Sequence, residues 1–319
     1  TNTVTPVRDC MADSVPVVVI CGQVPRSAVG TDAFQEAPVS AIMGAVAKHV
    51  FLVTDPERLE ATIRSAFELA RTGRPGPVVI DIPKDVQNWE GAFMGSGALP
   101  LTGYRRRLQA ETENRLTDES CGRFFEMLAE SERPLLSAGG GVNNANAAKS
   151  MRRLASEYGI PVTTTLMALG ASDTRHPLAL HMLGMHGIAS ANYAVEDCDF
   201  LMAVGARFDD RVAGDPARFA PNAKRIAHFD VDSAEIGKVK RVDWHHVGLL
   251  DRDLTELLAY GRRIGFSKDF QAWHEEIAHL KQEHCLNYDR DSELIQPYAV
   301  IEEINKHAKG EAIISTGVG

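Results

Sequence analysis

Four charged residues follow the end of a predicted buried strand and form the most chemically suggestive cluster in the chain. The segment GARFDDRVAG covers positions 205–214 and overlaps the apolar run DFLMAVGA, which predicts a strand. The carboxyl end of that strand is therefore followed by four charged residues: Arg207, Asp209, Asp210 and Arg211. Charges next to a core are costly unless something pairs them. They either pair with one another or face a polar ligand.

A run of three glycines occupies a similar place in the motif SAGGGVNNAN, between a predicted strand and a predicted helix. Glycines 139–141 would let the backbone approach a ligand closely, and the start of a helix favours an anion. The motif departs from the dinucleotide fingerprint G-x-G-x-x-G, because Asn144 stands where a small residue is needed and no acidic residue is well placed about 20 positions later. A ligand-binding loop and a tight turn both remain open.

Three further stretches combine polar groups with predicted strand ends or loops. In HFDVDSAEIG (228–237), Asp230 could hold the hydroxyl groups of a ribose or ribityl chain, whereas Asp232 is interpreted as the cap of a following helix. The stretch HMLGMHGIASANYAV (181–195) suits a flat aromatic ligand, although alone it favours a packed turn. The loop GQVPRSAVGTDAFQE (22–36) fits either a functional loop or a connector.

The histidines in WHEEIAHLKQEH do not form a metal-binding pair. A zinc motif of the H-E-x-x-H type needs histidines four positions apart on one helical face. His274 and His279 are five positions apart, so they point to different faces. We therefore expect no metal ligand here and interpret the segment as a solvated helix face.

The composition is that of a globular protein without nucleic-acid or membrane partners. The 319 residues are 44% hydrophobic and carry a net charge of −9, which argues against binding the phosphates of a nucleic acid. No apolar run approaches the roughly 20 residues of a membrane helix. The first residues, TNTVTPVRDC, do not resemble a signal peptide. Five scattered cysteines without a C-x-x-C pair indicate a reducing, cytoplasmic compartment.

The elements that would position these residues predict an α/β fold, with parallel sheets covered by helices in three-layer domains. Near the start, the predicted strands VPVVVICG (15–22) and GPVVIDIP (76–83) flank a predicted helix at 56–72. Residues 88–115 are rich in glycine, proline and charge and show no period, so they predict a surface linker.

A second α/β unit follows the linker. Its predicted helices cover 117–131, 144–159, 190–198 and a stretch near 252–263, and its predicted strands cover 134–141, 160–167, 199–208, 225–232 and a stretch near 245–250. A polar helix then leads away, residues 296–308 predict another helix, and AIISTG predicts the first strand of a third unit. The chain starts at Thr1 and ends on glycines after that strand, so we expect a piece of a longer protein.

Taken together, these stretches resemble one family closely. They follow the order seen in the catalytic large subunit of acetolactate (acetohydroxyacid) synthases, which depend on thiamine diphosphate: GQVPRSAVGTDAFQE, GRPGPVVIDIPKDV, TLMALG, LHMLGMHG, ANYAVED, RFDDRVAG, FDVDSAEIGK and AIISTGVG. The matches span essentially the whole chain, which would cover about half of such a subunit. Other thiamine-diphosphate enzymes share GRPGPV, but LGMHG together with RFDDR is specific.

The resemblance implies three domains. Residues 1–90 would be the C-terminal part of a pyrimidine-binding domain, 91–115 a linker, 116–265 a complete, Rossmann-like FAD-binding domain, 266–289 a linker helix, and 290–319 the truncated start of a diphosphate-binding domain.

The resemblance also assigns site residues. In the family, FAD contacts match Arg74, Gly139, Gly140, Gly141, Thr165, Leu166, Met167, Leu183, Gly184, Met185, His186, Gly205, Arg207, Asp209, Asp230, Val231 and Asp251. Residues of the active-site funnel match Phe34, Gln35, Lys84, Met185 and Arg211. Arg211 would grip the carboxylate of the second 2-keto acid with its planar guanidinium, with Asp210 orienting it.

The implied reaction condenses two pyruvates, or pyruvate and 2-ketobutyrate, with loss of carbon dioxide, in the biosynthesis of isoleucine and valine. Thiamine diphosphate is the electron sink, Mg²⁺ holds its diphosphate, and FAD shapes the site without net redox change. The family's activating glutamate and magnesium-binding G-D-G…N segment match nothing in this sequence, so the chain alone is expected to be inactive. Family members form homodimers or tetramers and often bind a small regulatory subunit.

Two positions depart from the family pattern. Ala168 stands for a glycine in TLMALG, and Leu250 replaces a glycine beside Asp251, which predicts weaker or altered flavin binding. Two other interpretations remain: a related flavin-containing thiamine enzyme of the glyoxylate carboligase or pyruvate oxidase type, and a nucleotide-binding module without catalysis.

Overall fold

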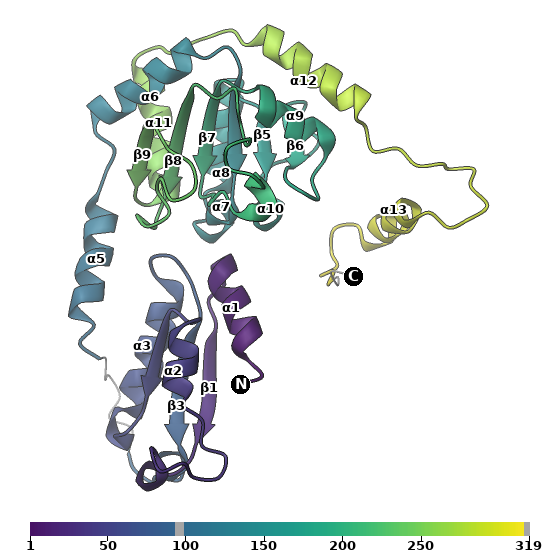
Figure 1. Cartoon of the computed structure of the whole chain (residues 1–319). Helices are drawn as coiled ribbons and strands as arrows, with labels where there is room; N and C mark the ends of the chain where they lie inside the picture. Colours follow the sequence, from purple (N-terminus) through teal and green to yellow (C-terminus); the bar gives the residue numbers. More distant parts are fainter. Residues whose placement is uncertain (93–98, 316–319) are drawn as a thin grey trace.

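The computed structural model describes residues 1–92 and 99–315, which form two α/β units joined by a helix and followed by two further helices (Figure 1). The first unit contains a parallel sheet of three strands in the order β1-β3-β2. Its elements are α1 (Val4–Asp13), β1 (Val18–Gln23), α2 (Val39–Gly44), β2 (His49–Leu52), α3 (Leu59–Arg71), β3 (Val78–Pro83) and α4 (Lys84–Gln87).

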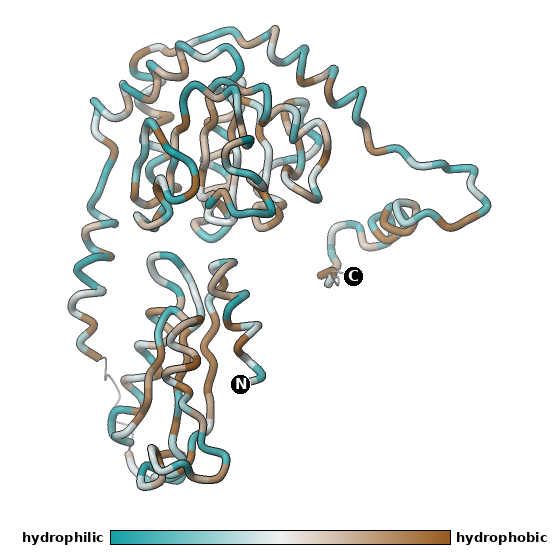
Figure 2. The backbone as a smooth tube through the Cα atoms, in the orientation of Figure 1, coloured by the Kyte–Doolittle hydropathy of each residue, from teal (hydrophilic) through white to brown (hydrophobic). Residues whose placement is uncertain are grey.

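Strand β3 forms the centre of the first sheet because its sequence, VVIDIP, is rich in β-branched residues that suit a doubly covered strand. All six of its residues are buried. Helix α3 packs on it through Ala66, Leu69 and Ala70, which recur at helical spacing. The helix stops before Gly73, which takes a φ of +57° that favours glycine. The strands of this sheet are mostly hydrophobic (Figure 2), although Gln23, His49 and Asp81 are polar.

The second unit contains a six-stranded sheet in the order β6-β5-β4-β7-β8-β9, and every pair is parallel. Its elements are α6 (Asp118–Glu130), β4 (Pro134–Ala138), α7 (Gly140–Asn144), α8 (Ala148–Glu157), β5 (Val162–Thr164), β6 (Ala179–Met182), α9 (Ala189–Asp197), β7 (Phe200–Val204), α10 (Asp210–Ala213), β8 (Arg225–Asp230), β9 (Trp244–Val247) and α11 (Leu250–Arg263). The predicted parallel α/β fold is therefore confirmed.

The strand order places a topological switch point between β4 and β7. From β4 the chain builds β5 and β6 on one side, then returns to build β7, β8 and β9 on the other. The two central strands pair in register from Pro134 opposite Phe200 to Ala138 opposite Val204. In open parallel sheets, ligands bind in the crevice beyond the carboxyl ends of the strands at such a point.

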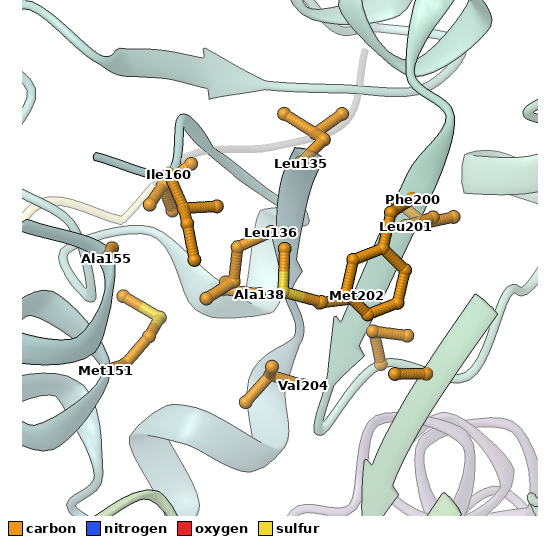
Figure 3. Packing of buried hydrophobic residues seen from close by; sticks show 14 of the residues in the cluster. Leu135, Leu136, Ala138, Met151, Ala155, Ile160, Phe200, Leu201, Met202 and Val204 are labelled. Carbon is orange, nitrogen blue, oxygen red and sulfur yellow. The ribbon is translucent and has the colours of Figure 1, made fainter. Parts of the chain in front are cut away.

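The core of the second unit lies on both faces of these central strands. Every residue of β4 and of β7 is buried. Leu136 and Met202 occupy paired positions on the two strands, and Met151 lies among the neighbouring side chains (Figure 3). Under α6, the ring of Phe124 meets the rings of Phe200 and Trp244 at centroid distances of 5.7 and 5.4 Å. This dense packing fixes the positions of the loops that leave the strands.

The predicted surface linker at 88–115 contains regular structure that the sequence did not indicate, because Thr102–Glu113 forms helix α5. Its polar sequence hides the helix, since only Leu101 and Tyr104 pack on the apolar cluster of the first unit. The remaining anchoring is polar, including two hydrogen bonds from Arg105 to Glu68. Residues 93–98 of the predicted linker lie outside the described part of the chain.

Several predicted boundaries also differ. Strand 160–167 shortens to β5. Strand 134–141 ends at Ala138, where α7 follows, and helix 144–159 begins only at Ala148, after Asn146 with a φ of +52°. Residues 233–237 form turns rather than a helix. Of the predicted strand AIISTG, residues 312–315 are in no strand and the rest lies outside the described residues. The sequence interpretation missed α1, α2, β2 and β6.

Two helices follow the second unit: α12 (Gln271–Glu283) packs against α9, and α13 (Pro297–Ala308) stands apart from both units (Figure 1). All five cysteines are free. In the part of the chain that the structure describes, no helix is both long enough and apolar enough to cross a membrane.

Replacing a phenylalanine in the core of the second unit should lower the stability of the protein far more than replacing an exposed phenylalanine. Phe124→Ala should lower the free energy of unfolding by about 3–5 kcal/mol, because it opens a cavity between four aromatic neighbours. Phe67→Ala, at a side chain that is 53% exposed, should change it by less than about 1 kcal/mol. Urea unfolding followed by tryptophan fluorescence measures both, and equal losses would contradict the assigned core.

Candidate ligand-binding site between the two units

A cavity of about 1070 Å³ lies between the first unit, α5 and the carboxyl edge of the central sheet. Its size is at the upper end of the range of roughly 300–1,000 Å³ that is typical of ligand pockets. Of the predicted FAD contacts, these residues line it: Arg74, Gly139, Gly140, Gly141, Thr165, Leu166, Met167, Gly205, Arg207, Asp209, Asp230, Val231 and Asp251. The structure thus brings together stretches that are far apart in the sequence.

The floor of the cavity is the contact between two glycine loops, one after β4 and one after β7. Gly141 donates its backbone N–H to the carbonyl of Gly205 at 3.1 Å. A Cβ on Gly141 would lie 2.8 Å from the Cα of Gly205, closer than real Cβ atoms come. A Cβ on Gly140 would meet the Cβ of Met167, also at 2.8 Å. These glycines are therefore required so that the loops can pack against each other, whether or not a ligand is present.

The cluster after β7 is only partly self-paired. Asp209 is the N-cap of α10 and accepts the backbone N–H groups of Arg211 and Val212 at 3.0 and 3.2 Å. Arg207 lies 3.8 Å from the carboxylates of Asp13 and Asp209. Among the described residues, Arg211 forms no ion pair, and the one hydrogen bond of its guanidinium is to the Sδ of Met185, at 3.8 Å. One guanidinium at the cavity wall is thus free to hold an anion.

The turn at 183–186 stands behind that guanidinium and does not line the cavity. Leu183 is buried in the core, and Gly184 has a φ of +100° where a Cβ would lie 2.5 Å from the carbonyl oxygen of Arg211. The backbone N–H of Met185 donates to the same carbonyl at 2.9 Å, and His186 is exposed. This stretch therefore shapes the position of Arg211, and its Met185 side chain, 62% exposed, is the part that a ligand could reach.

Arg74 joins the two units across the cavity. Its Nε donates to the hydroxyl of Ser14 at 3.0 Å, and its Nη1 donates to the buried carboxylate of Glu235 at 2.5 Å. Asp232 is a second, longer partner at 3.4 Å. Arg74 thus lines the cavity while its guanidinium is already held by protein groups from both sides.

Lys48 holds the turn that carries Arg74 from behind. Its Nζ donates to the carbonyl oxygens of Leu69, Thr72 and Arg74 at 2.5–2.7 Å, where the C-terminus of α3 presents unpaired carbonyls. Tyr104 of α5 is a further partner at 3.3 Å. Burial lowers the pKa of Lys48 to about 8. The sequence interpretation gave this residue no role.

Asp230 ends β8 at the cavity wall and accepts the backbone N–H of Asp232 at 2.9 Å. Burial raises the pKa of this carboxyl group to about 6, and the carboxylates of Asp232 and Glu235 act in the same direction. Asp232 accepts the N–H of Ala234 at 3.0 Å, as predicted for a cap, although it caps a turn rather than a helix.

Apolar side chains face the cavity on the side of β5. Leu166 and Met167 lie in the short 3-10 helix Leu166–Ala168 and are 66% and 39% exposed. Ala168 is fully buried in the core and is not part of the cavity wall, so its methyl group does not enter the space for a ligand. Leu250 does line the cavity, beside Asp251, whose carboxylate accepts the hydroxyl of Ser150.

Three predicted active-site residues lie elsewhere in this chain. Phe34 and Gln35 follow β1, and Lys84 follows β3. The cavity is instead lined by Ser14 and Arg74, which precede the amino-terminal ends of these strands. The strands have six residues each, which corresponds to roughly 20 Å. Phe34 is 90% exposed. A single chain therefore does not bring these residues to Arg211.

Other cavity residues were missed by the sequence interpretation. They are Arg8, Asp9 and Asp13 on α1, Glu111 on α5, Asn144, Glu235 and Arg252. Helix α1 has a weak amphipathic pattern, and the polar sequence of α5 predicts a linker, so neither helix indicates a ligand site. Glu235 lies in the stretch HFDVDSAEIG, where the sequence gives it no role in a ligand site. In the described residues no group of His, Cys, Asp and Glu could hold a metal ion. The Nε2 of His274 donates to the carbonyl of Gly159 at 2.6 Å.

Comparisons with known proteins agree with the motifs. Residues 122–257 match the family model described as the central domain of thiamine pyrophosphate enzymes. The chain is 43% identical to acetolactate synthase 1, chloroplastic, of Zea mays, covering 100% of this chain and 49% of that protein. It is 44% identical to the acetolactate synthase large subunit of Corynebacterium glutamicum, covering 100% of this chain and 50% of that protein. The chain thus spans about half the length of the curated relatives it matches.

A side chain at the glycine contact should destabilise the central unit. Gly141→Ala forces the loops after β4 and β7 apart and should lower the free energy of unfolding by about 1–3 kcal/mol. The matched control is Gly44→Ala, at a helical glycine with open space around it, which should be neutral or stabilising by up to about 1 kcal/mol. Denaturant unfolding of both variants measures the difference, and a neutral Gly141→Ala would refute the close contact.

The buried carboxyl group of Asp230 should make stability depend on pH. Its raised pKa means that the folded chain keeps a proton between pH 4 and 6 that the unfolded chain has released, so stability falls as pH rises through this range. Asp230→Asn keeps the acceptor for Asp232 but cannot titrate. The free energy of unfolding of the unsubstituted chain should therefore fall by roughly 2–3 kcal/mol over this range, and that of the variant should not. Unfolding curves of both proteins from pH 4 to 7 measure this, and parallel pH profiles would exclude a raised pKa.

Proposed function

Because this chain is related along its whole length to acetolactate synthases, we propose that it forms part of an enzyme that condenses two 2-keto acids with loss of carbon dioxide. The substrates would be two pyruvates, or pyruvate and 2-ketobutyrate, in the synthesis of branched-chain amino acids. The observation that most supports this is the convergence of four distant stretches, around residues 74, 140, 166 and 207, on one cavity.

We assign the cavity to FAD. The residues present fit such a ligand in three respects. The apolar Leu166 and Met167 offer a surface for a flat ring, the buried carboxyl of Asp230 can hold sugar hydroxyls, and the glycine floor leaves the backbone bare. When bound, FAD would shape the site and take no net redox part. The side chain of Leu250 stands in the cavity wall beside Asp251, where the family has a glycine. We therefore still expect Leu250 to weaken flavin binding.

Arg211 would bind the carboxylate of the acceptor keto acid. Its guanidinium is free of ion pairs in the described part of the chain and presents a planar fork that matches a carboxylate. The N-cap interaction of Asp209 and the turn at Met185 hold it in place. Asp210 forms no ion pair or hydrogen bond with the Arg211 side chain, so we propose that these two groups, and not Asp210, orient it.

A second copy of the chain would complete the active site. Phe34, Gln35 and Lys84 match the family's funnel but lie at the far end of the first sheet from Arg211. The exposure of Phe34 leaves its ring available to a neighbouring subunit. A homodimer or tetramer is therefore the proposed assembly, with a small regulatory subunit as a further possible partner.

Thiamine diphosphate, when bound, supplies the electron sink for the carbanion chemistry. We place its main anchors, and those of Mg²⁺, in segments outside residues 1–319, so the chain alone is expected to be inactive. The five free cysteines suit a reducing compartment, and we propose the cytoplasm. The name of the Zea mays relative includes a chloroplast location, which is the alternative.

Removing the guanidinium of Arg211 should separate the two halves of the reaction. In the complete protein, Arg211→Ala should lower acetolactate formation by roughly 10- to 100-fold, the loss expected for a charge-assisted hydrogen bond. Pyruvate decarboxylation should change much less, because the acceptor carboxylate takes no part in it. Carbon dioxide release and acetolactate are measured in the same assay.

The matched control is Arg218→Ala, at an exposed arginine that follows the same loop and forms no ion pair within the described residues. It should leave both rates unchanged. An equal loss of both rates in Arg211→Ala would count against a role in acceptor binding and favour a cofactor-binding or structural role instead.

A further inference from the structure

His228 is a buried histidine that the proposed function does not use. It lies in β8 with 0% exposure, and its Nε2 lies 2.8 Å from the carbonyl oxygen of Ala206. A carbonyl can only accept, so Nε2 must carry the proton. In the described part of the chain Nδ1 has no hydrogen-bond partner. The ring is therefore neutral, with its single N–H directed at Ala206. Burial lowers the pKa of His228 to about 4, which keeps this state at neutral pH.

The backbone that this histidine holds carries the charged cavity residues. Ala206 lies between Gly205 and Arg207, and the same loop continues to Asp209 and Arg211. All five residues line the cavity. The His228 contact is therefore made at the base of the segment from which the guanidinium groups extend.

The loop includes one strained residue, and His228 packs on it. Phe208 has a φ of +56°, a left-handed conformation that is costly for a bulky side chain. Its ring lies edge-on to the His228 ring at a centroid distance of 5.3 Å, and on another side it meets Phe219 at 5.9 Å. A conformation of this kind persists only when its surroundings over-determine it. Here a hydrogen bond to Ala206 and contact with two buried rings do so.

We propose that His228 is a positioning residue, whose Nε2–H holds the carbonyl of Ala206 and thereby fixes loop 205–211 so that Arg207 and Arg211 face the cavity. The loop in turn seats the Met185 turn, because the carbonyl of Arg211 accepts the N–H of Met185. The geometric part of this inference needs no ligand, whereas its effect on ligand binding rests on the proposed function.

Three substitutions separate the hydrogen bond from mere packing. The amide nitrogen of His228→Gln can occupy the place of Nε2 and keep the donor. In His228→Asn the amide is shorter and reaches only the place of Nδ1, and His228→Leu has no donor. The exposed His245, on the neighbouring strand β9, provides the control His245→Leu.

Amide hydrogen exchange in the full 319-residue chain provides the readout. The N–H groups of Val212 and Ala213 donate to Asp209, and that of Met185 donates to Arg211, so they report the closed loop. His228→Leu and His228→Asn should speed their exchange by on the order of tenfold or more, while His228→Gln should stay within about threefold of the unsubstituted chain. The amides of β4 should be unaffected, and His245→Leu should change nothing.

Equal acceleration in the Gln and Asn variants, or none in either, would overturn the proposal, even if His228→Leu fails to fold. So would ¹⁵N NMR of the unsubstituted chain showing the ring proton on Nδ1. FAD titration is a separate test. The affinity for FAD should be close to that of the unsubstituted chain in His228→Gln and lower in His228→Asn and His228→Leu. If FAD binds neither the chain nor any variant, the assignment of the cavity fails, and the exchange pattern still decides the role of His228.

Discussion

The contact between the loops that follow β4 and β7 is the constraint on which the site depends. The two strands are neighbours at the switch point of the sheet, so the chain must leave both at the same edge. The backbone of glycine 141 touches that of glycine 205, with no space for a Cβ on either. Every other part of the cavity is arranged around this floor: the apolar wall after β5, the acid at the end of β8, and the guanidinium groups beyond Gly205.

A second level of organisation joins the two units. Arg74 reaches from the turn before β3 to the buried Glu235, and Lys48 fixes the carbonyl groups of that turn. The charged groups of Arg74 and Lys48 are both partly removed from water. Such burial is stable only when several hydrogen-bond partners compensate it, and both side chains have several. The Arg74–Glu235 contact therefore spans the two units across the cavity, and Lys48 supports it from within the first unit. The His228 contact acts behind the residues that a ligand would touch, whereas Arg74 itself lines the cavity.

Much of the fold could be predicted from the sequence because apolar strands and turn glycines act locally. The strands PLLSA and FLMAV and the helix at 59–71 follow directly from such patterns. Helix α5 could not be predicted in this way, since its stability comes from polar contacts such as Arg105 with Glu68. The segments that form the cavity were recognised from the family motifs. The roles of Lys48, Glu235 and His228 depend on tertiary contacts, and no local pattern announces them.

The central claim is that one nucleotide ligand occupies the space between the two units. Hydrogen–deuterium exchange of this chain, with and without saturating FAD, tests it most directly. The account predicts slower exchange at the same FAD concentration in the turn at 72–74 of the first unit and in the loops at 139–141 and 205–211 of the second. Protection confined to one unit, or located around the loop of Phe34 instead, would contradict it.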